Sequence, residues 1–346
     1  MNTMNSLKFA GLMLAVFMAA CTNPNTNQKE TTTIQETKKS IEVEIPVNTG
    51  LLFSYLNETG DYVNSKEFPS LIKASIVFEE LGKNNFVIDI RKPEDYKKGH
   101  IKEAVNINFT DIPNYFQSKI KPFEYPKIIV VCSTGQNASY TVSLLRLMGY
   151  GNVYALRWGM SAWNREIADE NWLKGISSKY ESQLETTDVA KPAVGLFPNL
   201  KSDATQGEQL LQSRMDGLFK AGLENTTISA DSVFKNPSVY FIINFERKDK
   251  YEGGHIPGAV RYKPTGTLGI AIEMATIPAD KEVVVYCGTG HNSGFVTAYL
   301  NLFGYKARTL DFGNNSFMYD KMKKEKESLS WVTFSVGDIH NYPVVK

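Results

Sequence analysis

Short apolar runs alternate along the chain with longer segments in which apolar residues recur at helical spacing. The runs 86–90 and 128–131 are rich in β-branched residues, and the runs 241–245 and 283–286 share that character. Such runs are typical of buried strands, whereas the spacing of the longer segments is typical of helices with one apolar face. Buried strands that alternate with helices predict an α/β fold, in which a central, mostly parallel sheet is covered by helices on both faces.

The pattern occurs twice, at a constant separation of 155 residues. Three pairs of residues show this separation: His100 and His255, Cys132 and Cys287, and Gly149 and Gly304. The unit is longer than a solenoid repeat and therefore predicts a duplicated domain, which suits a chain of 346 residues. The predicted boundaries are 1–20 for a signal segment, 21–65 for a tether and N-terminal extension, 66–176 for the first domain, 177–224 for a linker, 225–325 for the second domain and 326–346 for a C-terminal tail.

The N-terminal segment has the pattern of an export signal. Lys8 precedes an apolar run over 9–20, which is too short to span a bilayer as a helix. The run ends in Met-Ala-Ala-Cys21, which resembles the lipobox of bacterial lipoproteins, and the polar stretch 22–40 is typical of a tether. This resemblance implies lipidation of Cys21 and a lipid-anchored protein of the bacterial cell envelope that faces the periplasm. A secretory signal cut nearby, or a chance cysteine, are the alternatives.

Charge and cysteine content narrow the function classes. The 38 Lys and Arg residues nearly balance the 37 Asp and Glu residues, which argues against a nucleic-acid partner. Three cysteines are too few for a disulfide framework in a chain of this length. Because Cys132 and Cys287 belong to separate predicted sheets, we expect them not to form a disulfide with each other.

Each of these two cysteines follows a buried strand and precedes a helix. This position is the ligand-binding edge of an α/β sheet, where the free N–H groups of a helix start favour negative charge. We therefore expect a thiol pKa below the usual value of about 8.5 and a reactive thiolate. Gly135 and Gly290 would let the loop backbone point several N–H groups at one anion. An inert cysteine buried at a strand end is the alternative for each copy.

At this point the chain resembles a tandem rhodanese over most of 70–170 and 225–320. Residues 89–96 with 99–101 resemble the N-terminal motif of that family, 132–137 have the length of its sulfurtransferase loop, and 156–163 resemble its C-terminal motif. The resemblance implies that sulfane sulfur moves from a donor such as thiosulfate, through a cysteine persulfide, to a thiol or cyanide acceptor. It implies no metal and no organic cofactor.

The resemblance also assigns the candidate site. Cys132 and Cys287 are the predicted sulfur carriers. The predicted substrate-binding loops are Ser133, Thr134, Gly135, Gln136 and Asn137 in the first copy and Gly288, Thr289, Gly290, His291 and Asn292 in the second. Asp89, Arg91, His100 and His255 are predicted supporting residues, and Trp158 and Trp163 are predicted core residues.

Two departures from the family pattern affect the expected activity. Neither loop contains Arg or Lys, so we expect weak binding of the thiosulfate dianion. The second copy has Asn244 and Glu246 where the first has Asp89 and Arg91. Both copies keep the cysteine, the loop length and the same Gly and Asn, which predicts that both cysteines carry sulfur. His291 is the single loop residue that could become cationic, which predicts that loading of Cys287 depends more strongly on pH.

Other activities fit the sequence less well. An envelope module that relays a persulfide between protein partners, with little turnover of free thiosulfate, is the main alternative. A phosphatase of the same fold needs a loop one residue longer and an arginine six positions after the cysteine, where Ala138 and Ser293 stand. Thiol–disulfide exchange is disfavoured because neither copy has a C-x-x-C pair.

Overall fold

The first half of the chain forms a five-stranded parallel sheet. The computed structural model describes residues 43–346 apart from 266, 270, 326 and 329. The strands are β1 (Leu71–Ile72), β2 (Phe86–Asp89), β3 (Val105–Asn106), β4 (Ile128–Val131) and β5 (Val153–Leu156). Their order is β1-β5-β4-β2-β3, with every neighbouring pair parallel. The strand that leads to Cys132 therefore lies in the centre of the sheet.

The second half repeats this sheet in the same order, β6-β10-β9-β7-β8. Its strands are β6 (Thr227–Ile228), β7 (Tyr240–Asn244), β8 (Val260–Arg261), β9 (Glu282–Tyr286) and β10 (Lys306–Leu310). Here too every neighbouring pair is parallel. The predicted α/β fold with two equivalent domains is confirmed.

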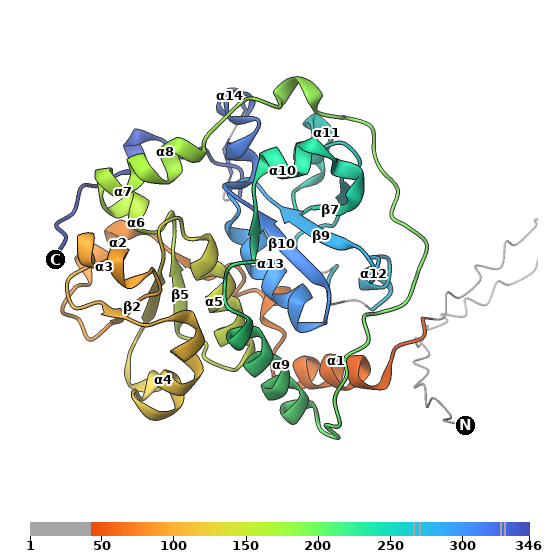
Figure 1. Ribbon diagram of the computed structural model, residues 1–346, viewed down its shortest axis with the longest axis horizontal. Helices are drawn as coiled ribbons and strands as arrows, with labels where there is room; N and C mark the ends of the chain where they lie inside the picture. Colours follow the sequence, from red (N-terminus) through yellow and green to blue (C-terminus); the bar gives the residue numbers. More distant parts are fainter. Residues whose placement is uncertain (1–42, 266, 270, 326, 329) are drawn as a thin grey trace, which may run out of the picture.

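Helices cover both faces of each sheet (Figure 1). In the first domain they are α2 (Ala74–Glu79), α3 (Pro93–Lys98), α4 (Ile112–Ser118), α5 (Gln136–Leu147), α6 (Met160–Trp163), α7 (Arg165–Glu170) and α8 (Trp172–Gly175). In the second they are α10 (Ala230–Lys235), α11 (Lys248–Gly253), α12 (Ala271–Met274), α13 (His291–Leu302) and α14 (Tyr319–Lys324). The four residues of β4 show the two faces: Ile128 and Val130 belong to one apolar cluster, and Ile129 and Val131 belong to another. This explains why the strand is apolar at every position.

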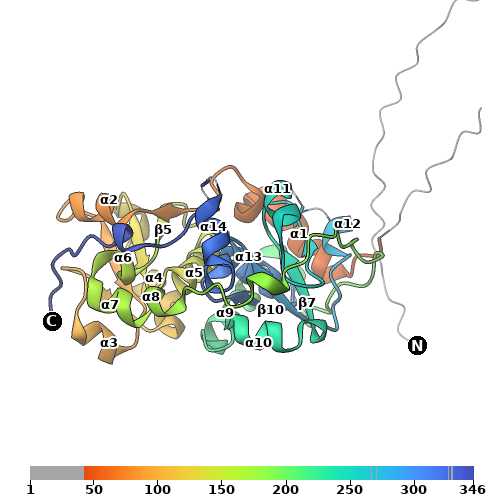
Figure 2. The same cartoon turned by 90° about the horizontal axis from the view of Figure 1, so that it is seen from above.

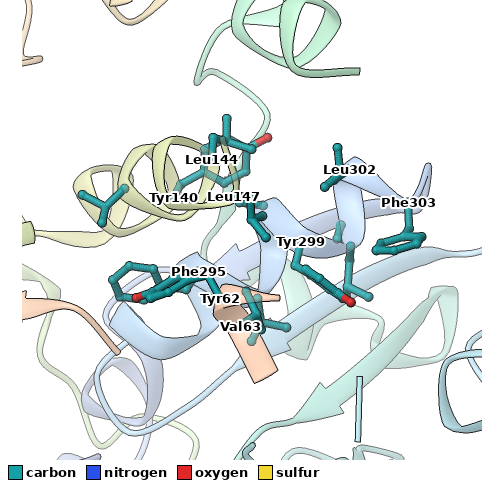
Figure 3. Packing of buried hydrophobic residues seen from close by; sticks show 14 of the residues in the cluster. Tyr62, Val63, Tyr140, Leu144, Leu147, Phe295, Tyr299, Leu302 and Phe303 are labelled. Atoms are coloured by element: carbon teal, nitrogen blue, oxygen red, sulfur yellow. The ribbon is translucent and has the colours of Figure 1, made fainter. Parts of the chain in front are cut away.

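The two domains meet where α5 packs against α13. Figure 3 shows Tyr140 and Leu144 of α5 beside Tyr299 and Leu302 of α13, and these side chains belong to one buried cluster. The hydroxyl of Ser143 also donates to the carbonyl of Phe295 at 2.9 Å. Both helices are buried on nearly all sides, which is why their apolar residues do not form a narrow stripe.

Two longer helices outside the repeats were not predicted. α1 (Val47–Thr59) lies in the N-terminal extension and α9 (Gly207–Ala221) lies in the linker, and they pack against each other (Figure 1). Buried leucines and phenylalanines from both helices join the cluster between the domains. No helix in the described part of the chain is long and apolar enough to cross a membrane.

Each domain is bound by a segment that follows the other domain. The linker runs along the second domain, where Glu185 forms a two-residue bridge with His255. The C-terminal tail crosses back, so that Val345 forms the equivalent bridge with His100. The C-terminus accordingly lies at the outer end of the first domain in both views (Figures 1 and 2). The linker and the C-terminal tail thus connect the two domains in addition to the contact between α5 and α13.

Candidate functional site

The loop around Cys132 directs backbone donors at its sulfur. The cysteine follows β4 directly, and Gly135 precedes α5 in the left-handed region, with φ at 87°. This turn brings the Gly135 N–H to 3.1 Å from Cys132 Sγ and the Ala138 N–H to 3.4 Å. The loop geometry is therefore the anion-binding arrangement that the sequence predicted.

The segment after β5 holds this loop in place. The Met160 N–H donates to the carbonyl of Cys132 at 2.9 Å, and the Ser161 N–H donates to the carbonyl of Ser133 at 3.1 Å. Gly159 passes so close that a Cβ atom there would lie 2.2 Å from the Cys132 carbonyl oxygen, and its φ is 59°. Only glycine fits this crossing. The motif at 156–163 thus supports the loop, while Trp158 and Trp163 are buried as predicted.

Asp89 and Arg91 form the predicted brace at the end of β2. Arg91 Nε donates to Asp89 Oδ1 at 3.0 Å, and Arg91 Nη2 lies 2.6 Å from Asp89 Oδ2 and 2.8 Å from the carbonyl of Gly99. The charge of Arg91 is therefore shared with Asp89 inside the protein. His100 is a further support, because its ring stacks on Tyr96 and its Nδ1 lies 3.0 Å from the Tyr96 carbonyl.

A cavity of about 390 Å³ opens over Cys132, which is 6% exposed. It is lined by Ile90, Arg91, Lys92, Asp95, Cys132, Ser133, Thr134, Asn137, Asn171, Leu223 and Glu224. A neighbouring cavity of about 470 Å³ shares Arg91, Asp95, Ser133 and Asn171 with it and reaches Val344 of the C-terminal tail. A small molecule can thus approach Cys132 from solvent, and the neighbouring cavity leaves room for a larger one beside it.

The expected low pKa of Cys132 is wrong for the resting site. Burial raises the pKa of this thiol above its ordinary value, and the backbone N–H groups of Ala138, Thr134 and Gly135 oppose that rise without cancelling it. The sequence showed the donors but not the depth at which the sulfur lies. A buried charge loses its solvation, and this loss is larger here than the gain from the donors.

Cys287 lies in a closed environment, although its loop has the same length. It is 0% exposed, and its Sγ accepts from the Ser293 N–H at 3.4 Å. The carboxylate of Glu246 accepts the N–H of Gly288 at 2.5 Å and the hydroxyl of Ser330 at 3.1 Å. A loop donor that could face a substrate anion is thus bound by a carboxylate of the protein itself. Burial and the charge of Glu246 both raise the pKa of Cys287.

Aromatic side chains pack beside the residue of the second domain that corresponds to Ile90. Phe245 is the counterpart of Ile90, which lines the cavity over Cys132. Phe68, from the segment before β1, packs edge-on against Phe245 and Phe295, with ring centroids 6.2 Å and 5.7 Å away. The corresponding segment before β6 supplies Leu223 and Glu224 to the open cavity of the first domain. Equivalent segments therefore place an aromatic ring against Phe245 in the second domain and line an open cavity in the first.

Gln136 and His291 do not face a substrate. Gln136 Nε2 donates to the carbonyl of Leu310 at 3.0 Å, and its Oε1 accepts the N–H of Phe312 at 3.0 Å. In the symmetric position, His291 Nε2 accepts the N–H of Trp158 at 3.1 Å. Burial first, and then the charge of Arg157, lower the pKa of His291 to about 3. The expectation of a cationic His291 is therefore wrong, because this residue is a buried link between the domains.

The other predicted loop residues have mixed roles. Ser133, Thr134 and Asn137 line the open cavity. Thr289 Oγ1 lies 2.9 Å from His291 Nδ1, and Asn292 is half-buried in the first turn of α13. His255 is buried and stacks on Tyr251, which makes it a support like His100.

Lys92, Asn171, Leu223 and Glu224 line the cavity but were not predicted. Lys92 directly follows Arg91 and could have been found from the motif. The last two come from the linker, and no local pattern links them to Cys132. Both cysteines are free thiols, as expected, whereas the predicted lipidation site at Cys21 lies outside the described residues. Within the described residues, no three His, Cys, Asp or Glu side chains gather as metal ligands would.

Comparison with known proteins places this geometry in a family. The family described as rhodanese-like domain matches the chain twice, at 74–166 and 230–319. Among curated proteins, the chain is 29% identical over 117 residues to a tRNA uridine(34) hydroxylase of Teredinibacter turnerae, which covers 33% of this chain and 34% of that protein. A tRNA uridine(34) hydroxylase of Rickettsia rickettsii is 27% identical over 137 residues, with 38% and 52% covered. The chain thus spans about a third to a half of the length of these relatives.

Solved structures with detectable likeness cover either less than a third of this chain or most of it. A thiosulfate sulfurtransferase from Pseudomonas aeruginosa is 17% identical, covers 83% of this chain and 50% of its own, and has a TM-score of 0.28. A rhodanese-related protein from Thermoplasma volcanium is 22% identical, covers 29% and 90%, and has a TM-score of 0.24. Since the family match accounts for more than half of the chain and coincides with both sheets, the protein belongs to the rhodanese-like domain family and carries two such domains in tandem.

Proposed function

We propose that this protein is a sulfurtransferase that moves sulfane sulfur from a donor such as thiosulfate to a thiol or cyanide acceptor, through a persulfide on Cys132. Membership of the rhodanese-like domain family supports sulfur transfer in general. The observation that carries the finer proposal is the position of Cys132, at an open cavity with two backbone N–H groups directed at its sulfur.

The geometry suits a two-step transfer. The Cys132 thiolate attacks the outer sulfur of thiosulfate, the S–S bond of the donor breaks, and sulfite leaves with the bonding pair. The resulting Cys132 persulfide carries its negative charge where the Gly135 and Ala138 N–H groups can stabilise it. An acceptor such as cyanide then attacks the outer sulfur, leaves as thiocyanate and restores the thiolate. The protein supplies the nucleophile and the donors, and no cofactor takes part.

In this proposal the second domain is a scaffold. Glu246 binds a loop N–H, Phe68 packs against Phe245, and Cys287 has no exposed surface. These contacts replace the two-site hypothesis that the repeat suggested. We expect Cys132 to gain one sulfur atom and Cys287 to gain none when the full chain is mixed with thiosulfate. Mass spectrometry of both cysteine peptides tests the proposal, and the absence of sulfur on Cys132 with every sulfane donor would reject it.

A persulfide relay between protein partners is the second candidate. The observation that favours it is that neither loop contains a cation to attract free thiosulfate. Steady-state turnover with thiosulfate and cyanide, measured beside loading from a protein persulfide, separates the two. Rapid loading from the protein together with negligible turnover of thiosulfate would favour the relay.

We expect loading of Cys132 to accelerate with pH. Because burial raises the pKa of its thiol, the thiolate is the minor form at neutral pH. Its fraction then grows about tenfold per pH unit below that pKa. The rate of loading from thiosulfate should rise throughout roughly pH 6 to 8.5 without a plateau. Alkylation of Cys132 by iodoacetamide is the control, since it reports the thiolate without a donor. A plateau below pH 7 in both assays would contradict the raised pKa.

We further propose that the mature protein is held in the bacterial envelope by a lipid on Cys21. The support is the short apolar segment ending in Met-Ala-Ala-Cys21 and the polar stretch behind it. Cys21→Ser is expected to remove the protein from the membrane fraction, because the acyl chains supply the membrane affinity. The comparison is fractionation of both forms expressed in a bacterial host. A variant that remains with the membranes would count against the lipid anchor.

A further inference from the structure

One wall of the cavity over Cys132 belongs to the linker and not to the first domain. α9 ends before Gly222, and the next residues include Leu223 and Glu224, which line the cavity. The hydroxyl of Thr226 lies 2.7 Å from the carbonyl of Leu223 and 3.2 Å from Oδ1 of the loop residue Asn137. The wall is therefore tied to the loop that follows Cys132, and Glu224 is one of the residues on this wall.

Two of the four charged residues that line the cavity are already paired. Arg91 is bound to Asp89, and Asp95 pairs with Lys98 at 2.7 Å. Lys92 and Glu224 are exposed, and in the part of the chain that the structure describes neither has an ion-pair partner. The cavity thus presents one cation and one anion to an entering molecule.

This pair of charges does not suit a dianion. Thiosulfate would be attracted by Lys92 but repelled by Glu224, and the loop itself adds no cation. A molecule with both a carboxylate and an ammonium group could place one charge near each residue. The cavity of about 390 Å³ lies in the size range of pockets that take small organic ligands.

We infer, on the basis of the proposed function, that Glu224 determines donor selectivity and that the site favours a zwitterionic amino-acid persulfide, of the cysteine type, over thiosulfate. The Cys132 thiolate attacks the outer sulfur of R–S–SH, the S–S bond of the donor breaks, and the thiolate RS⁻ leaves. The sulfane sulfur and its proton remain on Cys132 as Cys132–S–SH. This step follows the same course as the reaction with thiosulfate, since the outer sulfur moves to the thiolate and an anion leaves. It needs no oxidant or reductant.

The test compares Glu224→Gln with the unmodified full chain. The rate of sulfur loading on Cys132 is measured by mass spectrometry with L-cysteine persulfide, N-acetyl-L-cysteine persulfide and thiosulfate. Acetylation removes the ammonium charge and keeps the carboxylate, so it isolates the contact with Glu224. Because Glu224 is exposed, we expect a change of about twofold to fivefold. Glu224→Gln should slow loading from L-cysteine persulfide and accelerate loading from the other two donors.

Glu208→Gln is the matched control, because Glu208 is exposed in the first turn of α9 and does not line the cavity. It makes the same change in net charge and should leave the three rates unchanged. Equal effects of Glu224→Gln on all donors, or none, would overturn the selectivity and leave the proposed function intact. A Cys132 that takes sulfur from no donor would instead overturn the proposed function, and the inference with it.

Discussion

Cys132→Ser is expected to abolish sulfur transfer, with a loss of about a thousandfold or more, whereas Cys287→Ser should leave the rate within about twofold. A serine hydroxyl cannot form the persulfide, and no other thiol lies at an open cavity in the described part of the chain. Cys287 is fully buried, and Glu246 binds the N–H of Gly288 in its loop, so we expect no donor to reach its sulfur.

The measurement is turnover with thiosulfate and cyanide, beside persulfide analysis of each remaining cysteine. Serine adds a hydroxyl to the buried position at Cys287, so Cys287→Ala, which keeps the site apolar, serves as the folding control. Urea unfolding of each variant shows whether a loss of activity results from a loss of stability. Full activity of Cys132→Ser, or loss of activity in a stably folded Cys287→Ala, would invert the assignment of the two domains.

The repeat, with its constant separation of 155 residues, was enough to predict much of the fold from the sequence. The apolar runs that end at Cys132 and Cys287 became the central strands β4 and β9, since a strand buried on both faces must be apolar throughout. The short ionic pair Asp89–Arg91 and the glycine before α5 were also readable, because each acts on neighbours in the same motif.

Features that depend on contacts with the other half of the chain could not be predicted from the sequence. Phe68 lies before β1 of the first domain but packs against Phe295 of the second, and Glu224 lies in the linker but lines the first cavity. Gln136 and His291 stand in polar loops of the sequence, where a role in substrate binding was expected. The packing of α5 against α13 instead buries both, and each forms a hydrogen bond to the other domain. The difference between an open and a closed loop therefore arises from tertiary contacts that no local motif records.

Burial of Glu246 at the closed loop lowers the stability of the fold at neutral pH. Its side chain is 0% exposed, and burial raises its pKa from an ordinary 4.5 to about 7, against the opposing hydrogen bonds from Gly288 and Ser330. The folded protein therefore holds a proton on Glu246 over a pH range in which the unfolded chain has released it. A group with a raised carboxyl pKa makes folding less favourable as the pH increases, so this contribution to stability is lost between about pH 4.5 and 7.

Glu246→Gln is expected to remove that loss. Glutamine has nearly the same shape, can accept the Gly288 N–H through Oε1 and can donate to the Ser330 hydroxyl, but it does not ionise. A shift from 4.5 to about 7 corresponds to about 3.5 kcal/mol, at about 1.4 kcal/mol per pKa unit. The free energy of unfolding of the variant should match that of the unmodified protein near pH 4.5 and exceed it by about 3.5 kcal/mol above pH 7. Urea unfolding across this range measures the difference, with Glu224→Gln, which removes an exposed carboxylate, as the control for the change in net charge. A difference for Glu246→Gln that does not grow with pH would mean that this carboxylate is ionised in the fold without penalty.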